Sequence, residues 1–437
     1  MINMCTNLNS FSKLNSLLLY RNILDDQIVK KLSKLISSLN KNNNTDTKTL
    51  KNNYYELIAD LIKIAEQENF AGDIWKEYLL KLIITDQNIF SLRCEQDAKN
   101  IGDSLYQAAI HDLKILQQIY QFKLQNLAQQ IELKDLNFIN NFLPSKRSKN
   151  KETPASNFKK IIDAFNNHRA TTTLTKSLME YYQDHGVGTL GLYKAFRWKD
   201  NQLIGIKDPD SISFDNLVGY ENQQEKLIHN TEAFLNNKAA NNVLLFGDSG
   251  TGKSSSVKAL LNQYSEVGLR LIELNKDQMK ELPKILESLK KRGLHFIIFM
   301  DDLSFEDFET EYKYMKAIIE GGVEVKPDNV LFYATSNRRH LIKEKWSDRD
   351  QESGEVHLSD AIQEKISLSS RFGLTIFYES PNQKDYLTIV KELAKQNKLT
   401  ISEEKLKTKA LQWEMWHNGR SGRTAQQFIN YLLGQEA

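Results

Sequence analysis

The sequence predicts an α/β fold, with a five-stranded parallel sheet and a small helical lid, preceded by an all-α N-terminal domain. Three observations predict it. Helix breakers are scarce at the start, where the first proline is Pro144 and only Gly72 and Gly102 precede Gly186. From Ser211 onward, short apolar runs alternate with helical patterns, as in a parallel sheet covered by helices. One of those apolar runs leads into a glycine-rich turn.

Length and composition narrow the class of protein. A chain of 437 residues exceeds what one hydrophobic core usually organises, so we expect several domains. A net charge of +2 argues against a protein that coats nucleic acid. The two cysteines, Cys5 and Cys94, form neither a disulfide framework nor a C-x-x-C pair, which favours a reducing compartment without structural zinc. No apolar run approaches a membrane span, so we expect a cytoplasmic protein without a membrane partner.

We predict four parts. Residues 1–142 form an N-terminal helical domain, because apolar residues recur there at helical spacing, as in Ile28–Leu32–Leu35–Ile36. No catalytic cluster stands out in this part, which favours a scaffold or a surface that docks a partner. Residues 143–210 contain a linker, helices and a β-hairpin, residues 211–381 an α/β domain, and residues 382–437 a helical lid.

The second part opens with a polar linker over residues 143–156. It is basic, and such a run either contacts phosphate backbones or is simply solvated, as most linkers are. Its basic residues are Lys146, Arg147, Lys149 and Lys151. Farther on, Leu190–Trp198 and Gln202–Ile206 flank the tight-turn pair Asp200-Asn201, which predicts a β-hairpin. We place a domain boundary after this hairpin, near Pro209.

The α/β part contains five apolar runs of strand length. They are Val243–Phe246, Leu269–Leu274, Phe296–Met300, Val330–Thr335 and Leu374–Tyr378. Helical patterns at about 253–264, 277–292 and 309–320 separate them, and Gly321-Gly322 ends the last one in the manner of a C-cap. Strands alternating with helices predict a parallel sheet.

The turn after the first strand matches G-x-x-x-x-G-K-[ST]. Gly247, Gly250 and Gly252 allow the backbone to curl so that several N–H groups converge on a phosphate. Lys253 is spaced to reach the β- and γ-phosphates, and Ser254 offers a hydroxyl group to Mg²⁺. A chance glycine-rich loop is the alternative, but the strand before and the helix after favour a nucleoside triphosphate site. The predicted binding residues are Gly247, Asp248, Ser249, Gly250, Thr251, Gly252, Lys253, Ser254 and Ser255.

A second group of candidates follows the third and fourth strands. Asp301 and Asp302 come directly after the buried run ending at Met300, at the sheet edge where ligands bind. We assign Asp301 to magnesium, together with Ser254, and Asp302 to orienting the attacking water. Solvated acids at a strand end are the alternative. Asn337 follows the next strand and is either a contact to the γ-phosphate or an ordinary turn residue.

Two arginines complete the candidate site. Arg371 comes just before the fifth strand, and Arg423 lies in the first turn of the last helix. A guanidinium group against the γ-phosphate stabilises charge in the transition state. A surface salt bridge is the alternative for each, because spacing alone does not locate these side chains. Arg338 and Arg339 face either a phosphate or a partner.

With these residues assembled, residues 211–437 resemble an AAA+ ATPase module. Gly247–Ser254 is similar to its Walker A motif, Ile297–Asp302 to its Walker B motif and Asn337 to its sensor 1. The resemblance implies that Arg371 is an arginine finger and Arg423 a sensor 2. It also implies ATP and Mg²⁺ as cofactors, and assembly with further copies of the chain.

Other stretches refine the resemblance. Leu217-Val218-Gly219-Tyr220 is similar to the segment that cups adenine, which adds Val218 and Gly219 to the binding residues. Residues 367–387 resemble the initiator and helicase-loader branch of AAA+ proteins. The nearest resemblance is to an uncharacterised family of bacterial ATP-binding AAA+ proteins. It is carried by Asp301–Phe305, Tyr333–Arg339 and Ser421–Thr424.

One position departs from the wider pattern. The water-orienting residue is usually Glu, whereas Asp302 sets its carboxylate back by one bond of about 1.5 Å. Because small misplacements lower rates strongly, hydrolysis is expected to be slow. Glu306 lies near enough in sequence to be a weaker alternative.

Three functions are consistent with the sequence. The first is an oligomeric AAA+ ATPase that couples Mg-ATP binding and hydrolysis to remodelling of an unknown protein target recruited by the N-terminal domain. The second is a DNA-associated loader that switches on ATP binding; the near-neutral charge and the lack of a helix-turn-helix or zinc module do not favour it. The third is a nucleotide-gated interaction platform that hydrolyses little ATP.

Overall fold

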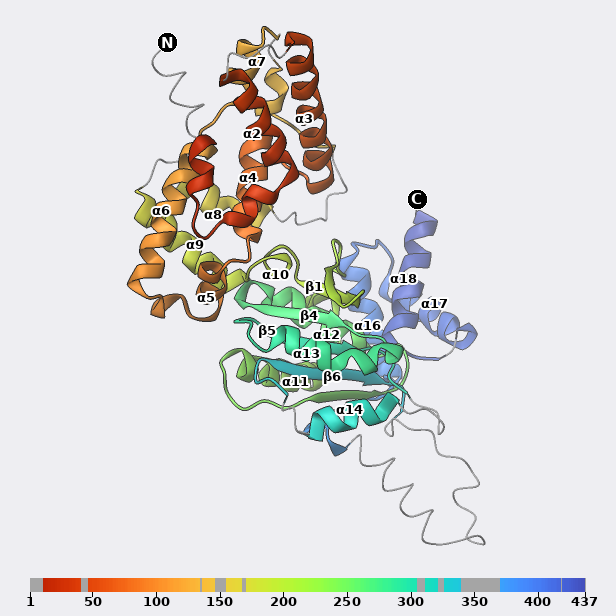
Figure 1. Ribbon diagram of the computed structural model, residues 1–437. Coiled ribbons are helices and arrows are strands. Elements are labelled where there is room, and N and C mark those ends of the chain that lie inside the picture. The colour runs from red at the N-terminus through yellow and green to blue at the C-terminus, as the bar shows by residue number, and fades with distance from the viewer. Residues whose placement is uncertain are drawn as a thin grey trace. The chain divides into compact units, whose positions relative to one another are not determined.

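The computed structural model describes nine segments of the chain, and several predicted features fall outside them. The segments are residues 11–40, 46–133, 136–145, 155–166, 170–304, 311–320, 326–338, 370–417 and 419–436. Outside them lie Cys5, the four basic linker residues, Glu306, Gly321-Gly322 and Arg339. The chain divides into two compact units, Met1–Tyr193 and Lys194–Ala437 (Figure 1).

The first unit is helical, as predicted. Its helices are α2 (Gln27–Asn40), α3 (Thr47–Glu68), α4 (Ile74–Thr85), α5 (Ile89–Asp97), α6 (Asp103–Tyr120), α7 (Leu124–Gln130), α8 (Ala155–Asn166), α9 (Thr171–His185) and α10 (Thr189–Leu192). Side-chain caps begin several of them. The Asp73 side chain accepts hydrogen bonds from the backbone of Trp75 and Lys76 at the start of α4. Such caps satisfy amides that have no partner inside the helix.

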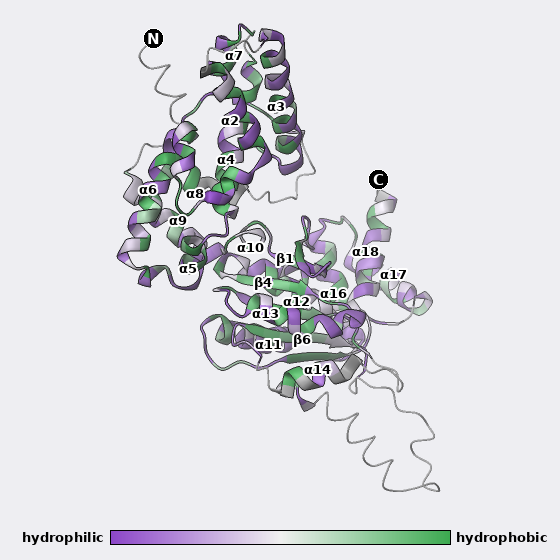
Figure 2. Cartoon of the chain, viewed as in Figure 1, coloured by the Kyte–Doolittle hydropathy of each residue, from purple (hydrophilic) through white to green (hydrophobic). Residues whose placement is uncertain are grey.

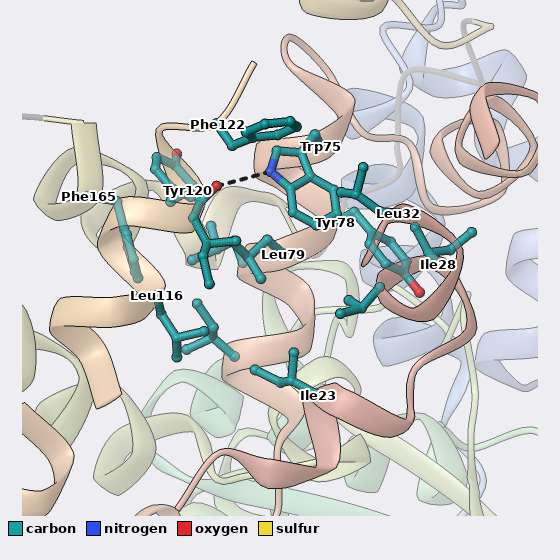
Figure 3. Packing of buried hydrophobic residues seen from close by; sticks show 14 of the residues in the cluster. Ile23, Ile28, Leu32, Trp75, Tyr78, Leu79, Leu116, Tyr120, Phe122 and Phe165 are labelled. Atoms are coloured by element: carbon teal, nitrogen blue, oxygen red, sulfur yellow. Dashed lines mark hydrogen bonds between the residues drawn. The ribbon is translucent and has the colours of Figure 1, made fainter. Parts of the chain in front are cut away.

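Aromatic side chains from different helices form the core of this unit. Trp75 of α4 is 1% exposed, and its indole N–H donates to the carbonyl of Ile119 on α6 at 3.2 Å (Figure 3). The rings of Tyr120 and Phe165 lie 4.7 Å apart and join α6 to α8. A buried indole or phenol keeps a polar partner in this way while most of its surface packs. The core therefore includes helices on both sides of the predicted linker.

The second unit is built on one sheet with the order β2-β1-β4-β5-β6-β3-β7. The strands are β1 (Ala195–Lys199), β2 (Gln202–Gly205), β3 (Val243–Gly247), β4 (Leu269–Glu273), β5 (His295–Met300), β6 (Val330–Ser336) and β7 (Leu374–Tyr378). The last five are the predicted strands and pair in parallel. Every residue of β6 is buried, and Figure 2 shows this strand mostly in the green of hydrophobic residues, as expected of a strand covered on both faces.

The predicted count of five strands is wrong, because the hairpin joins the sheet. β1 pairs in parallel with β4, from Ala195 opposite Leu271, and carries the antiparallel β2 with it. Asp200 and Asn201 both have positive φ, at 53° and 59°, which suits a two-residue hairpin turn. The hairpin is also shorter than predicted, since Thr189–Leu192 forms α10 and β1 begins only at Ala195.

Helices pack on the sheet and form a separate lid core. The helices of this unit are α11 (Glu221–Leu235), α12 (Lys253–Tyr264), α13 (Leu282–Leu289), α14 (Glu311–Glu320), α16 (Gln383–Gln396), α17 (Glu403–Trp416) and α18 (Gly422–Glu436). α11 and α12 share a hydrophobic cluster with the strands. α16, α17 and α18 bury a cluster of their own, which includes Tyr386, Leu406 and Phe428. α13 begins at Leu282 with Pro283 in its first turn, so the α-helix predicted from residue 277 starts later.

The structure assigns the predicted second part to both units. α8 and α9 belong to the unit Met1–Tyr193, while the hairpin belongs to the unit Lys194–Ala437. The four-part division itself stays a prediction.

Among the described residues, none of the helices combines the length and the apolar content that crossing a membrane requires.

Candidate nucleotide-binding site

The glycine-rich turn between β3 and α12 has the backbone that a phosphate-binding loop needs. Gly247, Gly250 and Gly252 have φ of 131°, 77° and 94°. A Cβ atom on Gly247 would lie 2.0 Å from the carbonyl oxygen of Tyr378, so no larger residue fits there. At Gly252, by contrast, a Cβ atom would meet nothing within 4 Å. The turn is thus closed against β7 on one side and open on the other.

Lys253 lies under this turn. It is 7% exposed, and its ammonium group donates to the carbonyls of Gly247 and Asp248 at 2.9 and 2.6 Å and to Asn337 Oδ1 at 3.2 Å. Burial lowers the pKa of Lys253, while the carboxylates of Asp248, Asp302 and Asp301 act in the opposite direction. The ammonium group is therefore held at the turn by carbonyl and amide oxygens.

The side chain of Asp248 accepts a hydrogen bond from outside the loop. Its Oδ2 accepts from the backbone N–H of Ser380 at 2.8 Å, and this bond lowers the pKa of Asp248. Asp248 and Gly247 do not line the cavity described below, whereas Ser249 through Ser255 do. A negative charge turned away from the loop leaves its amides available to an anion.

The acidic pair after β5 contacts the first turn of α12. Ser254 Oγ donates to Asp301 Oδ1 at 2.5 Å, although the two residues are 47 positions apart. Asp302 has a positive φ of 50°, and its Oδ1 accepts from the side-chain amide of Asn337 at 2.8 Å. Asn337, which follows β6, thus contacts both Lys253 and Asp302.

The sequence analysis did not single out Thr335, which lies at the centre of this group. Its hydroxyl donates to Asp301 Oδ1 at 2.6 Å and accepts from the backbone N–H of Asp302 at 2.8 Å. Thr335 is 1% exposed and lines the cavity. Threonine is common in strands because of its β-propensity, so its presence at position 335 does not by itself predict a functional residue. The one sequence signal is that it lies two residues before Asn337.

These residues line one end of a cavity of about 540 Å³, which is in the range of small-molecule sites. Five apolar residues line the cavity as well; the predicted adenine segment contains Leu217 and Val218, of which only Val218 was predicted to bind, and the other three were not predicted. The five are Ile212, Leu217, Val218, Ile389 and Leu393. Gly219 is absent from the lining but has a φ of 83° and accepts a hydrogen bond from Gln224 through its carbonyl. The cavity thus combines polar phosphate-binding groups with an apolar surface.

The two candidate arginines lie at different places. Arg423, at the start of α18, lines the cavity, donates from its backbone to Gly250 at 3.1 Å and reaches Ser249 Oγ at 3.4 Å. Arg371 precedes β7, whose Leu374 and Tyr378 pair with Val243 and Gly247 of β3. Because these strands are parallel, Arg371 lies at the strand end opposite the glycine-rich turn. It does not line the cavity.

The residues fit a magnesium ion that arrives with phosphates. Ser254 and Asp301 would be its protein ligands, because their side-chain oxygens already lie next to each other at the end of the glycine-rich turn. The described segments contain no group of three or more His, Cys, Asp or Glu residues that could hold a metal. Magnesium commonly keeps several waters and completes its shell with substrate phosphates, so two protein ligands suffice.

The strand order and the site together define the class of the second unit. A parallel core β4-β5-β6-β3-β7, with a glycine-rich turn after β3 and an acidic pair after β5, has the arrangement of a P-loop α/β domain. Residues 191–436 match the family described as "Protein of unknown function (DUF815)". The chain belongs to this family. No curated protein matches the sequence.

Several solved structures are similar to this chain at low sequence identity. A Thermotoga maritima RuvB mutant is 19% identical, with a TM-score of 0.36. The match covers 50% of this chain and 64% of the RuvB chain, which is slightly less than two thirds of RuvB. The Thermotoga maritima RuvB Holliday junction branch migration motor is 16% identical, with 51% and 72% covered and a TM-score of 0.31. The FIGL-1 AAA domain in complex with ADP is 17% identical, with 50% and 72% covered and a TM-score of 0.35.

Proposed function

We propose that this protein is an ATPase that binds Mg-ATP in the cavity of its second unit and couples hydrolysis to remodelling of a protein target. One observation carries the proposal. Lys253 and Ser254 of the glycine-rich turn meet Asn337 and Asp301 of two neighbouring strand ends within hydrogen-bond distance. That constellation brings a cation, amide donors and a carboxylate to one end of a cavity of nucleotide size.

Each group has a role in this proposal. The amides of the turn and Lys253 bind the phosphates, and Arg423 reaches them from the lid. Ser254 and Asp301 hold Mg²⁺, which when bound neutralises developing phosphate charge. Asp302 and Asn337 orient the attacking water. The apolar residues of the cavity receive the base.

The proposal is tested by substituting Lys253 and a matched lysine of the same helix. Lys258 also lies on α12 but does not line the cavity, and its ammonium group is 3.7 Å from Asp210. Loss of a charge-assisted contact predicts that Lys253→Ala weakens ATP binding by about 10-fold to 100-fold. Lys258→Ala should bind and hydrolyse ATP as the unaltered chain does. Equal ATPase rates in Lys253→Ala and the unaltered chain would exclude this site.

We also propose that copies of the chain assemble, with Arg371 of one copy facing the nucleotide of the next. Arg371 is remote from the glycine-rich turn of its own chain, because it precedes β7 at the opposite strand end. An arginine supplied in trans raises phosphoryl-transfer rates by about 10³-fold to 10⁵-fold. The specific activity should therefore rise with protein concentration. In Arg371→Ala this dependence should disappear while ATP binding persists.

A second candidate function is a nucleotide-gated interaction platform with little turnover. The hydrogen bond between Asn337 and Asp302 favours it, because it engages the carboxylate that would orient water. Asp302 is also shorter than the glutamate usual at this position. Tight ATP binding without phosphate release, measured at high protein concentration and with added partners, would select this function over the first.

The target is proposed to bind the helical unit Met1–Tyr193. Asp302→Asn should retain bound ATP and so prolong contact with that target. Affinity capture with this variant, compared with Lys253→Ala, should enrich a protein that depends on bound nucleotide. Equal recovery from both variants would argue against a nucleotide-dependent target.

A further inference from the structure

Thr335 makes hydrogen bonds to three consecutive residues of the acidic edge. Its hydroxyl donates to Asp301 Oδ1 at 2.6 Å and accepts from the N–H of Asp302 at 2.8 Å. Its backbone carbonyl accepts from the N–H of Leu303 at 2.7 Å. A hydroxyl group offers one donor and two acceptor sites, so the same oxygen serves both acidic residues at once.

The register of the sheet explains this contact. β5 and β6 are parallel neighbours, and Met300 lies opposite Ala334, so that Asp301 continues opposite Thr335. Thr335 is 1% exposed, whereas Asp301 and Asp302 are exposed at the cavity. The buried side chain of Thr335 therefore anchors the exposed side chain of Asp301 and the backbone of Asp302.

Both acidic residues need such an anchor. Asp301 Oδ1 accepts from Thr335 and from Ser254, and these two bonds set the direction of its carboxylate. Asp302 has a φ of 50°, a conformation that residues with a Cβ atom seldom adopt. The bonds from Asp302 and Leu303 to Thr335 hold the backbone in that conformation.

We propose that Thr335 is a positioning residue, whose hydroxyl sets Asp301 to receive magnesium and Asp302 to face the attacking water. The inference rests on the proposed function, since it assigns a role within the same site. It deepens that function by naming a residue, Thr335, that acts through Asp301 and Asp302. The hydroxyl, rather than the shape of the side chain, is what the role requires.

Two substitutions separate the hydroxyl from the shape. Thr335→Val keeps the shape and removes the hydroxyl, whereas Thr335→Ser keeps the hydroxyl. Thr231 is the matched control, because it is also buried, and its hydroxyl contacts Leu227 and Tyr333 outside the cavity. All variants are made in the full chain, and binding of a fluorescent ATP analogue is measured in EDTA and across a magnesium titration.

The expected result is a change in the response to magnesium alone. Thr335→Val should bind the analogue in EDTA as the unaltered chain does, which also shows that it is folded. Its half-saturating magnesium concentration should rise about 10-fold to 100-fold, as for other residues that orient metal ligands. Thr335→Ser and Thr231→Val should respond as the unaltered chain does.

Four results would overturn the inference, and they are distinguishable. An unchanged magnesium response in Thr335→Val would show that the hydroxyl is not needed. Equal losses in Thr335→Val and Thr335→Ser, or weaker binding in EDTA for Thr335→Val, would assign Thr335 to packing. If the unaltered chain itself binds no analogue with or without magnesium, the proposed function fails and this inference fails with it.

Discussion

The side-chain amide of Asn337 donates to Asp302 Oδ1 at 2.8 Å, across the gap between the ends of β6 and β5. The oxygen of the same amide accepts from Lys253 at 3.2 Å. One asparagine thus connects the lysine that would bind phosphate with the carboxylate that would orient water. A γ-phosphate entering between them would compete for both contacts.

Replacing Asn337 should therefore impair turnover more than binding. In Asn337→Ala the carboxylate of Asp302 loses its amide donor, and a water or phosphate oxygen loses a preorganised contact. Loss of one such donor typically lowers kcat about 10²-fold to 10³-fold. Steady-state phosphate release and equilibrium ATP binding are the measurements. A weaker affinity with unchanged kcat would instead show that Asn337 only supports Lys253.

The length of the side chain at position 302 should limit the rate. Asp302→Glu moves the carboxylate outward by one bond, toward the position expected of the glutamate that the AAA+ resemblance implies. Because sub-ångström to ångström placement controls catalysis, we expect hydrolysis to rise by about 10-fold or more. Asp302→Asn, of nearly equal size, is the control and should bind ATP without hydrolysing it. A slower Asp302→Glu would mean that the turn at Asp302 is built for the shorter acid.

How far the sequence predicts the site depends on how local its geometry is. The turn from Gly247 to Ser254 could be predicted because its glycines and Lys253 are adjacent in the chain and determine their own backbone. Asp301 could be predicted because the carboxyl ends of parallel strands share one sheet edge. Thr335 could not, since its contacts depend on the register between β5 and β6, which neither strand encodes alone.

The fold follows the same rule. The five parallel strands are short, mainly apolar runs, and such a run predicts a buried strand by itself. Each of the five is found where predicted. The hairpin turn at Asp200-Asn201 is also local. That β1 adds to the edge of β4 is a non-local pairing, so the predicted strand count was too low. The apolar stretch from Leu190 predicts a strand, whereas Thr189–Leu192 is helical, because four residues are too few to show a helical period.

Two glycines of the loop should differ in what they tolerate. Gly247→Ala would bring a Cβ atom 2.0 Å from the carbonyl oxygen of Tyr378, whereas Gly252→Ala would meet nothing within 4 Å. Both have positive φ, so the difference isolates the steric clash. Overpacking predicts that Gly247→Ala unfolds about 1 to 3 kcal/mol more easily than Gly252→Ala. Denaturant unfolding of the second unit measures this, and equal stabilities would contradict it.

The helical unit should become less stable as pH rises from about 4.5 to about 7. Burial, with a smaller effect from Asp73, raises the pKa of Glu77 to about 7 from the ordinary value of 4.5. The folded unit therefore binds more protons than the unfolded chain between these values, and its stability falls as pH rises across that range.

Glu77→Gln removes this titration. It should flatten the pH dependence and stabilise the unit at pH above about 7, by on the order of 1 to 2 kcal/mol once the partial exposure of Glu77 is allowed for. Hydrogen exchange of the α4 amides, between Ile74 and Thr85, at acidic and alkaline pH is the local measurement. Glu56→Gln, on the exposed side of α3, is the control and should leave the dependence intact. A variant at Glu77 that exchanges with the same pH dependence as the unaltered chain would place the proton on another group, such as Asp73, which caps α4 and whose pKa is also raised by burial.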